Sequence, residues 1–490
     1  MAGTTSLSRY VDAADINKKL DELIRQPVYS ISKDALSRYE SEYFDRKCTK
    51  SKAMIEEAKA IIPGGVQHNL AFNYPFPLVF TCAKGNTLTD IDGNEYYDFL
   101  QAGGPTVLGS NPDTVREKVF DLLEKCGPTT GLFHEYEYKL GALIAKNISS
   151  VDMFRMYTSG TEACMVASRV ARMATGKKNI VKMGGAYHGW SDMLAYGIRI
   201  PGTRGLQSPG IPSFCFKHTQ EFFPGNLNSL EHVLRLNRLS GGTAGVFMEP
   251  IGPESGSWPI SIEFAQGVQA LCKKYGALLI FDEVVTCFRM GMGGAQGYMG
   301  ISPDLTVFGK VIAGGYPGAG GLGGRKEYMK FLGAGLDGGG KKAFSGGTLA
   351  ANPLSCAAGY YTLLEIERTD ACRKANDIGD MLTDGWKILI KEYNLPFVAF
   401  NVGSICHLDT LGTMHYSINW KKPWTIPKVL RETSVRKREM EHMGAAYMAE
   451  GLVTLAGNRL YTNATYTQSD IKNVLESFAR IFRNIEVKKP

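Results

Sequence analysis

A single lysine, Lys310, stands where an amine could act as a nucleophile. The apolar run 305–308 leads through Gly309 to this lysine, and a glycine-rich stretch follows at once. An amine at the edge of an apolar strand is partly desolvated, which disfavours its charged form and makes it a candidate for Schiff-base formation. A lysine that merely extends its charge into solvent from a strand end is the alternative interpretation.

An aspartate 28 residues upstream supplies a complementary charge. The apolar run 277–281 is typical of a strand buried in a parallel sheet, and Asp282 follows at its carboxyl end, where open α/β sheets bind ligands. An imine-forming lysine and an aspartate beneath a pyridine nitrogen are the pair that pyridoxal-phosphate chemistry needs, because the aspartate keeps the ring protonated. A helix-capping or turn aspartate is the alternative.

A helix amino terminus is predicted at residues 159–161, Ser-Gly-Thr. Ser159 and Glu162 have the spacing of a capping box, small and apolar residues then recur at helical spacing, and Gly176 ends the helix. The N–H groups and two hydroxyls of such a terminus can hold a phosphate dianion with the help of the helix dipole. An ordinary capped helix explains the same pattern.

An aromatic residue follows the next predicted strand. This strand ends at Val181, and the motif 185–189, Gly-Ala-Tyr-His-Gly, comes after it. Tyr187 could stack on a flat ring. A core tyrosine and a hydrogen-bonded core histidine are the alternative, which we favour for His188.

A third strand-like run ends in an acid. Residues 245–248 lead to Glu249, and Glu254 follows in a loop rich in glycine and proline. With Lys310 and Asp282, three predicted strands therefore end in an ionisable residue.

Length and composition indicate a large globular chain of balanced charge. Its 490 residues are 44% apolar and 21% charged, with a net charge of +7, so the chain can bury a large core. The densest basic cluster, 436–438, lies among glutamates and predicts a solvated helix face rather than a nucleic-acid surface. Ten scattered cysteines, with no apolar leader or membrane-length apolar run, predict a cytoplasmic protein without a membrane segment or a metal site.

Short motifs follow one another in a characteristic order. They are Pro63-Gly64-Gly65-Val66, Asp90-Ile91-Asp92-Gly93-Asn94, residues 158–162, 185–189, 281–286 and 293–297, Pro303-Asp304, Gly309-Lys310, Gly347-Thr348 and Asn352-Pro353. In this order they resemble the class III (subgroup II) aminotransferases, closest to the glutamate-1-semialdehyde aminomutase-like branch. The resemblance extends from about residue 63 to residue 481.

The resemblance implies an α/β fold of the aspartate aminotransferase type, which is fold type I of the pyridoxal-phosphate enzymes. A large domain with a mostly parallel seven-stranded sheet and a small α+β domain are expected, in a homodimer with active sites at the interface. Residues 1–60 would form a helical extension, 61–105 the first part of the small domain, 106–355 the large domain and 356–490 the rest of the small domain. The implied cofactor is pyridoxal 5′-phosphate, and the implied partners are a small-molecule amino donor and acceptor.

The resemblance also implies residue roles. Lys310 would form the internal aldimine and carry the proton of a 1,3-shift between Cα and C4′, and Asp282 would pair with the pyridine nitrogen. The other cofactor contacts would come from Ser159, Gly160 and Thr161 at the phosphate, Tyr187 and Val284 on the two faces of the ring, and Thr348 at the phosphate of the neighbouring subunit.

The substrate contacts depart from those of the aminomutases. Their serine and arginine after the Pro-Gly-Gly-Val motif are absent from segment 67–72, and Arg459 stands near the place of their glutamate. Ornithine and 4-aminobutyrate aminotransferases have an arginine there, partnered by a glutamate in a loop like 249–254. We therefore expect Arg459 to bind the α-carboxylate of glutamate or 2-oxoglutarate and Glu254 to neutralise it for the other substrate, with Glu249 in the same loop. A surface arginine is the alternative.

The predicted activity moves an amino group between an amino acid and an oxo acid or aldehyde. An aminomutase or an amino-acid racemase begins with the same proton abstraction, so both stay open. A cofactor-binding protein without turnover is a different class, against which the imine-forming Lys310 argues. The residues do not define the physiological amine.

Overall fold

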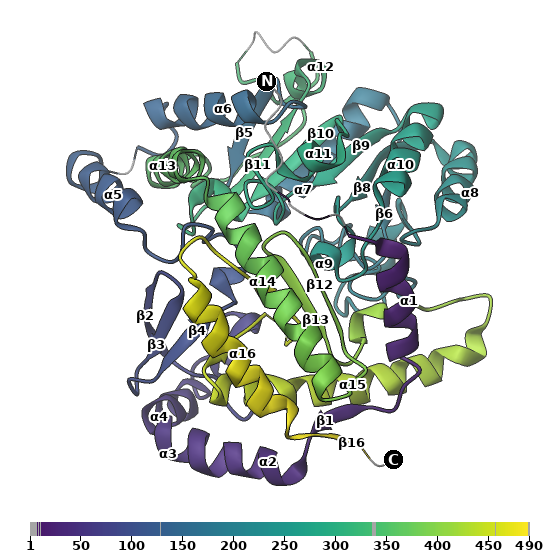
Figure 1. The fold of residues 1–490 in the computed structure, drawn as a ribbon. Helices are drawn as coiled ribbons and strands as arrows, with labels where there is room; N and C mark the ends of the chain where they lie inside the picture. The colour runs from purple at the N-terminus through teal and green to yellow at the C-terminus, as the bar shows by residue number, and fades with distance from the viewer. Residues whose placement is uncertain are drawn as a thin grey trace. The chain divides into compact units, whose positions relative to one another are not determined.

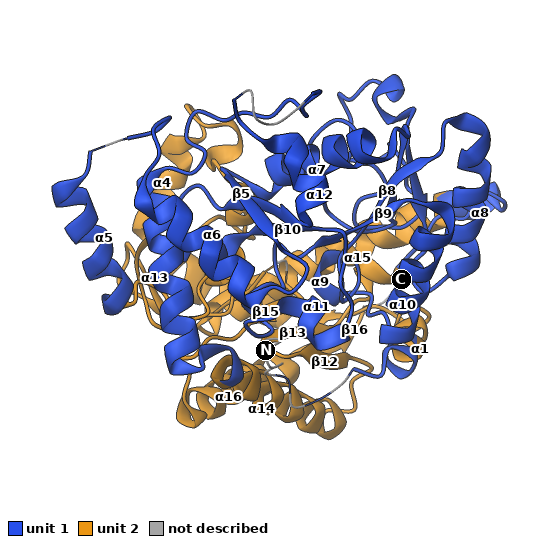
Figure 2. Cartoon of the chain, turned by 90° about the horizontal axis from the view of Figure 1, so that it is seen from above, with its two compact units in different colours: residues 1–17, 113–373, 416–426 blue, residues 18–112, 374–415, 427–490 orange. Residues whose placement is uncertain are grey.

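The computed structural model describes residues 7, 9, 11–127, 129–335, 340–455 and 457–488. The chain forms two compact units. Unit 1 contains residues 1–17, 113–373 and 416–426, and unit 2 contains residues 18–112, 374–415 and 427–490 (Figure 2). The four-segment division expected from the sequence stays a prediction beside this one.

A seven-stranded sheet forms the centre of unit 1, with the strand order β5-β11-β10-β9-β8-β6-β7 (Figure 1). Only β11 runs antiparallel to its neighbours, so the prediction of a mostly parallel seven-stranded sheet is confirmed. The strands are β5 (Met153–Tyr157), β6 (Asn179–Met183), β7 (Thr219–Phe222), β8 (Thr243–Met248), β9 (Leu278–Asp282), β10 (Leu305–Gly309) and β11 (Gly320–Gly324).

Helices cover both faces of this sheet, which explains why its central strands are apolar throughout. Phe247 and Ile280 pack against α7 (Gly160–Thr175) on one face. Val246 and Leu279, their chain neighbours, pack against α8 (Leu227–Asn237) and α10 (Ile262–Tyr275) on the other. Each such fully buried side chain stabilises the fold by about 1.5–3 kcal/mol.

Further helices complete unit 1. They are α5 (Asp113–Lys125), α6 (Glu135–Asn147), α9 (Pro253–Gly256), α11 (Gly294–Met299), α12 (Lys326–Met329) and α13 (Pro353–Thr369). None of the helices in the described parts of the chain is long and apolar enough to cross a membrane.

Unit 2 contains three small sheets. Strands β2 (Phe80–Lys84), β3 (Thr87–Asp90), β4 (Glu95–Asp98) and β14 (Leu452–Val453) form one; β12 (Val398–Val402), β13 (Ile405–Asp409) and β15 (Arg459–Tyr461) form another; β1 (Tyr29–Ile31) pairs with β16 (Ile485–Val487). The turn expected at residues 92–94 joins β3 to β4, and the Asp90 carboxylate accepts the backbone N–H of Asn94.

The helices of unit 2 pack around a core that includes Trp386 and Phe478, whose rings meet edge to face. They are α2 (Lys33–Arg38), α3 (Asp45–Lys47), α4 (Thr49–Ala58), α14 (Ala371–Glu392), α15 (Ile426–Ala449) and α16 (Gln468–Phe482). Helix α1 (Ala13–Leu23) spans the boundary at residues 17 and 18, and α14 spans the one at 373 and 374.

Candidate active site

Lys310 lies directly after β10 and begins a single 3-10 turn, Lys310–Ala313. Its backbone has a φ of 47°, in the left-handed region that residues other than glycine rarely adopt. Such a conformation costs on the order of 1–3 kcal/mol and is found chiefly at functional sites. The side chain is half-buried.

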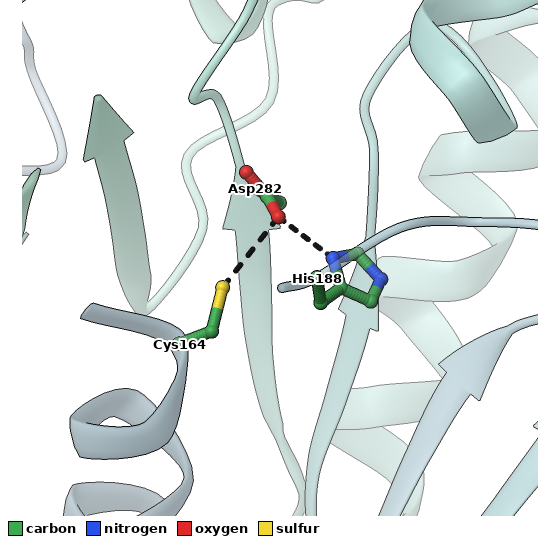
Figure 3. Close-up of side chains that lie close together, drawn as sticks. All are labelled: Cys164, His188 and Asp282. Carbon is green, nitrogen blue, oxygen red and sulfur yellow. Dashed lines mark hydrogen bonds and ion pairs between the residues drawn. The ribbon is translucent and has the colours of Figure 1, made fainter. Parts of the chain in front are cut away.

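Asp282 ends β9, the strand next to β10, where it is the register partner of Val307. The residue is buried. Its carboxylate contacts Cys164 of α7 and His188 of the loop after β6 (Figure 3). Oδ2 lies 2.7 Å from Nδ1 of His188 and 3.6 Å from Sγ of Cys164, while Oδ1 accepts the N–H of Val284. The lysine and the aspartate singled out in the sequence therefore stand at the same edge of the sheet.

His188 is buried and hydrogen-bonded, as the sequence favoured, and its partner is the Asp282 carboxylate. A carboxylate can only accept, so Nδ1 of His188 donates to Asp282, and Nε2 has no partner among the residues that the structure describes. Burial lowers the pKa of His188, opposed by the hydrogen bond to Asp282. With Cys164, the three side chains have ligand-type atoms within 4.8 Å of one another. Of these atoms, Nδ1 of His188 and Oδ2 of Asp282 are already engaged in the hydrogen bond between the two residues.

The amino terminus of α7 forms as predicted, with Ser159 as its cap, but the expected capping box is only half made. Ser159 Oγ accepts the N–H of Glu162 at 3.3 Å. The Glu162 carboxylate instead accepts the N–H of Thr158 at 2.8 Å and its hydroxyl. Gly160 and Thr161 are the first two positions of the helix, where the N–H groups have no acceptor within the helix itself.

Glycines allow the site elements to pack closely around Val284. A Cβ on Gly160 would lie 2.9 Å from Val284 Cγ2, and one on Gly309 would lie 2.8 Å from Val284 Cγ1. A Cβ on Gly189 would lie 2.4 Å from Thr161 Oγ1. The start of α7, the end of β10 and the 185–189 loop therefore meet where no further side chain fits. These groups suit an anionic, ring-shaped aldehyde cofactor. The N–H groups at the start of α7 can bind the anion, the Lys310 amine can bind the aldehyde, and the buried Asp282 carboxylate can pair with the ring.

Glu249, at the end of β8, joins two loops. Its carboxylate accepts the N–H groups of Tyr187, Glu254 and Ser255 at 3.0, 2.9 and 2.6 Å. Burial first, then the charges of Glu254 and Asp282, raise the pKa of Glu249 to about 8. Its contacts in the structure are to backbone, and direct contact with a substrate stays a prediction. Tyr187 itself is half exposed, 47% of its surface being accessible.

Three predicted residues remain: Glu254, Arg459 and Thr348. Glu254 is half-buried and, like Ser255, has a left-handed backbone, with a φ of 50°. Arg459 begins β15 in unit 2, opposite His407 of β13. Its pairing with Glu254, a residue of unit 1, stays a prediction. Thr348 is exposed in unit 1, and its role across an interface also stays a prediction.

A mostly parallel seven-stranded sheet, with a lysine and an aspartate ending adjacent strands and a helix amino terminus beside them, defines a pyridoxal-phosphate enzyme of fold type I. The chain belongs to the class-III aminotransferase family, whose model matches residues 71–481. The resemblance noted in the sequence is thereby confirmed, and the protein is a pyridoxal-phosphate-dependent enzyme.

Individual relatives agree with this membership. The chain is 38% identical over 382 residues to glutamate-1-semialdehyde 2,1-aminomutase of Legionella pneumophila subsp. pneumophila, covering 75% of this chain and 86% of that one. An omega-transaminase from Sphaerobacter thermophilus has a TM-score of 0.78 at 24% identity, covering 90% and 99% of the two chains. A glutamate-1-semialdehyde aminomutase from Pseudomonas aeruginosa PAO1 has a TM-score of 0.75 at 22% identity, covering 95% and 98%. Both structures support the fold.

Proposed function

We propose that the protein transfers an amino group between an amino acid and an oxo acid or aldehyde, with Lys310 and Asp282 as its catalytic residues. The observation that carries the proposal is that these two residues end adjacent parallel strands. When bound, pyridoxal phosphate supplies a ring that accepts the electrons left when the substrate Cα–H bond breaks.

Residues of the chain would move the proton and hold the ring nitrogen. Lys310 would take the proton from the substrate Cα and deliver it to C4′ of the cofactor, because an amine near the reacting atoms can act first as base and then as acid. Asp282 holds the ring nitrogen in its protonated form, and the hydrogen bond from His188 fixes the orientation of that carboxylate. A carboxylate held in one direction loses nothing to reorientation during the reaction.

The phosphate and the ring would be held by other residues. The N–H groups of Gly160 and Thr161, with the hydroxyls of Ser159 and Thr161, would bind a dianion at the positive end of α7. Val284 and Tyr187 would contact the two faces of the ring. Support for this comes from the packing of Val284 against Gly160 and Gly309.

The amino donor proposed is L-glutamate, with Arg459 binding its α-carboxylate and Glu254 neutralising Arg459 for the second substrate. A guanidinium suits this task because its planar donors match a carboxylate bidentately. The Glu249 carboxylate accepts the backbone N–H of Glu254. This hydrogen bond supports a defined position for the Glu254 carboxylate.

The protein is further proposed to be a cytoplasmic homodimer in which Thr348 reaches the phosphate of the neighbouring subunit. Ten cysteines scattered along the chain suit a reducing compartment. Phe344, near Thr348, exposes 84% of its surface, and Phe133 exposes 80%. Such exposed aromatic residues are typical of interfaces.

The test is the absorption spectrum of the purified holoenzyme before and after L-glutamate is added without an oxo acid. Conversion of the yellow band to that of the pyridoxamine form supports the proposal. A yellow protein whose band does not change retains the cofactor but argues against glutamate as donor. A colourless protein that cannot be reconstituted contradicts the assignment altogether.

An aminomutase is a second candidate, favoured by the 38% identity to an enzyme of that name. An aminomutase needs no second substrate, so nitrogen would stay on one carbon skeleton. Incubation with ¹⁵N-labelled glutamate and a panel of oxo acids and aldehydes separates the two. Label on a second carbon skeleton supports an aminotransferase, and isomerisation of glutamate 1-semialdehyde in the absence of any oxo acid argues for the aminomutase.

A further inference from the structure

A fully buried lysine, Lys182, lies inside β6, beyond the place where the sequence predicted this strand to end. Its ammonium group donates to three backbone carbonyls, those of Ala186 at 2.7 Å, Tyr196 at 2.7 Å and Leu194 at 3.3 Å. A lysine ammonium has three donors, so the three carbonyls match its full capacity. All three belong to the chain that leaves β6, which also contains Tyr187 and His188.

A half-buried acid, Glu221, is the register partner of Lys182 in the neighbouring strand β7. Its carboxylate accepts the N–H groups of Gly202 at 3.0 Å and Arg204 at 3.3 Å. The carboxylate packs closely against Gly197, where an added Cβ would lie 2.3 Å from Glu221 Oε2. Burial lowers the pKa of Lys182 to about 8 and raises that of Glu221, and the attraction between the two opposes both shifts.

Together the two side chains hold both parts of the excursion 184–204. Lys182 binds its first part at residues 186 and 194–196, and Glu221 binds its return at residues 202 and 204. The carbonyl of Ala186 immediately precedes Tyr187. Any movement there would shift the N–H of Tyr187 against Glu249 and the ring of His188 against Asp282.

We propose that the buried Lys182 and the half-buried Glu221 form a charged anchor that positions Tyr187 and His188 for cofactor binding. The inference rests on the proposed function, in which Tyr187 contacts the ring and His188 orients Asp282. Both anchor residues act through the excursion and are positioning residues. Neither takes part in the bond changes of the reaction.

The test compares three variants of the full-length protein, Lys182→Met, Glu221→Gln and the double variant. Lys178→Met serves as a control, because Lys178 is exposed just before the same strand. The dissociation constant for pyridoxal phosphate is measured with the apoenzyme, and the bound cofactor is examined by visible circular dichroism. Displacement of contact residues such as Tyr187 and His188 typically weakens the function of a site by roughly tenfold or more. K182M should therefore bind the cofactor at least about tenfold more weakly, and the bound cofactor should have a weaker visible dichroism.

The double variant should lose little more than K182M alone, because both residues hold the same excursion. Equal affinity and equal dichroism in K182M and K178M would overturn the proposal. The variant Asp282→Asn distinguishes a failure of the proposed anchor from a failure of the proposed function. If D282N weakens binding and K182M does not, the anchor is refuted while the proposed function stands; if neither variant weakens binding, both fail.

A measurement on the unmodified chain covers the case in which K182M does not fold. Hydrogen exchange of the wild-type apoenzyme reports on the amides of Gly197, Gly202 and Arg204, all of which donate hydrogen bonds within the anchored excursion. The proposal expects protection close to that of β6 without any cofactor present. Rapid exchange at these amides would overturn it.

Discussion

At the scale of single residues, the proposed chemistry depends on a small set of side chains whose neighbours hold them in place. Lys310 occupies a strained backbone position at the end of β10. Asp282 accepts a hydrogen bond from a buried histidine. In a buried position this hydrogen bond is electrostatically stronger than it would be in solvent, so it holds the carboxylate in one orientation.

Replacing Lys310 with alanine should abolish nitrogen transfer, because no other amine would carry the proton. The loss should exceed roughly 10³-fold, within the range of removing a general acid–base group. Single-turnover rates with L-glutamate measure it, and Lys326→Ala, on the exposed surface of the same unit, is the control. Turnover of K310A at the wild-type rate would exclude Lys310 from the reaction.

His188 predicts a dependence of stability on pH. Because burial lowers its pKa, the folded state resists protonation at a pH where the unfolded chain accepts a proton. The contribution of His188 to stability should therefore be constant above about pH 6.5 and fall as the pH drops below it, by up to about 1.4 kcal/mol per pH unit.

His188→Asn should remove this contribution, so that its thermal midpoint changes less than that of the wild type between pH 7.5 and pH 5.5. The exposed His232→Asn is the matched control. Identical slopes in H188N and wild type would show that His188 does not make this contribution.

At the scale of elements, the site exists because two strand ends and one helix end approach within van der Waals distance. The side chain of Val284 fills the space between Gly160 at the start of α7 and Gly309 at the end of β10. Gly309 has an extended backbone, with a φ of −168°. Glycine is therefore needed here because a side chain would collide with Val284, and not because of the backbone conformation.

Gly309→Ala should destabilise the protein by about 1–3 kcal/mol through overpacking against Val284 and should weaken cofactor binding. The double variant G309A/V284A should regain part of the stability, since the smaller side chain makes room. Gly346→Ala, where a Cβ meets nothing within 4 Å, is the control. Thermal midpoints of the four proteins decide, and equal midpoints for G309A and G346A would contradict the packing argument.

At the scale of the whole molecule, the chain alternates between its two units and returns to each more than once. Unit 1 contains the lysine and the aspartate, and unit 2 contains Arg459. Thr348, proposed to serve the neighbouring subunit, adds a third contribution.

Arg459→Ala should raise the Michaelis constant for L-glutamate by roughly tenfold or more, since a charged hydrogen-bonded pair would be lost. The Michaelis constant for a donor without an α-carboxylate should change little. Arg438→Ala, exposed on α15 of the same unit, is the control. An unchanged Michaelis constant for glutamate in an active R459A enzyme would remove Arg459 from the substrate site.

Thr348 predicts complementation between subunits. Thr348→Ala should weaken cofactor binding, and the particle should have twice the 53.6 kDa mass of one chain by light scattering. Mixed dimers of K310A and T348A should be more active than either variant alone, because one of their sites has both native residues. No gain on mixing would place Thr348 outside the neighbouring site.

The sequence by itself was sufficient for the parts of this protein that depend on local patterns. Continuous apolar runs predicted the parallel strands, and Lys310 and Asp282 could be placed at one edge because such strands end on the same side of a sheet. The start of α7 at Ser159 and its end at Gly176 followed from capping preferences. Motif order predicted the family.

Only the tertiary structure revealed the partners of these residues. His188 meets Asp282 across 94 residues of sequence, and Tyr187 meets Glu249 across 62. Lys182, a charge within an apolar run, could be understood only once the carbonyls around it were visible. Local patterns report what each segment buries. Hydrogen bonds between distant segments depend on how strands and loops are brought together, and no periodicity encodes that.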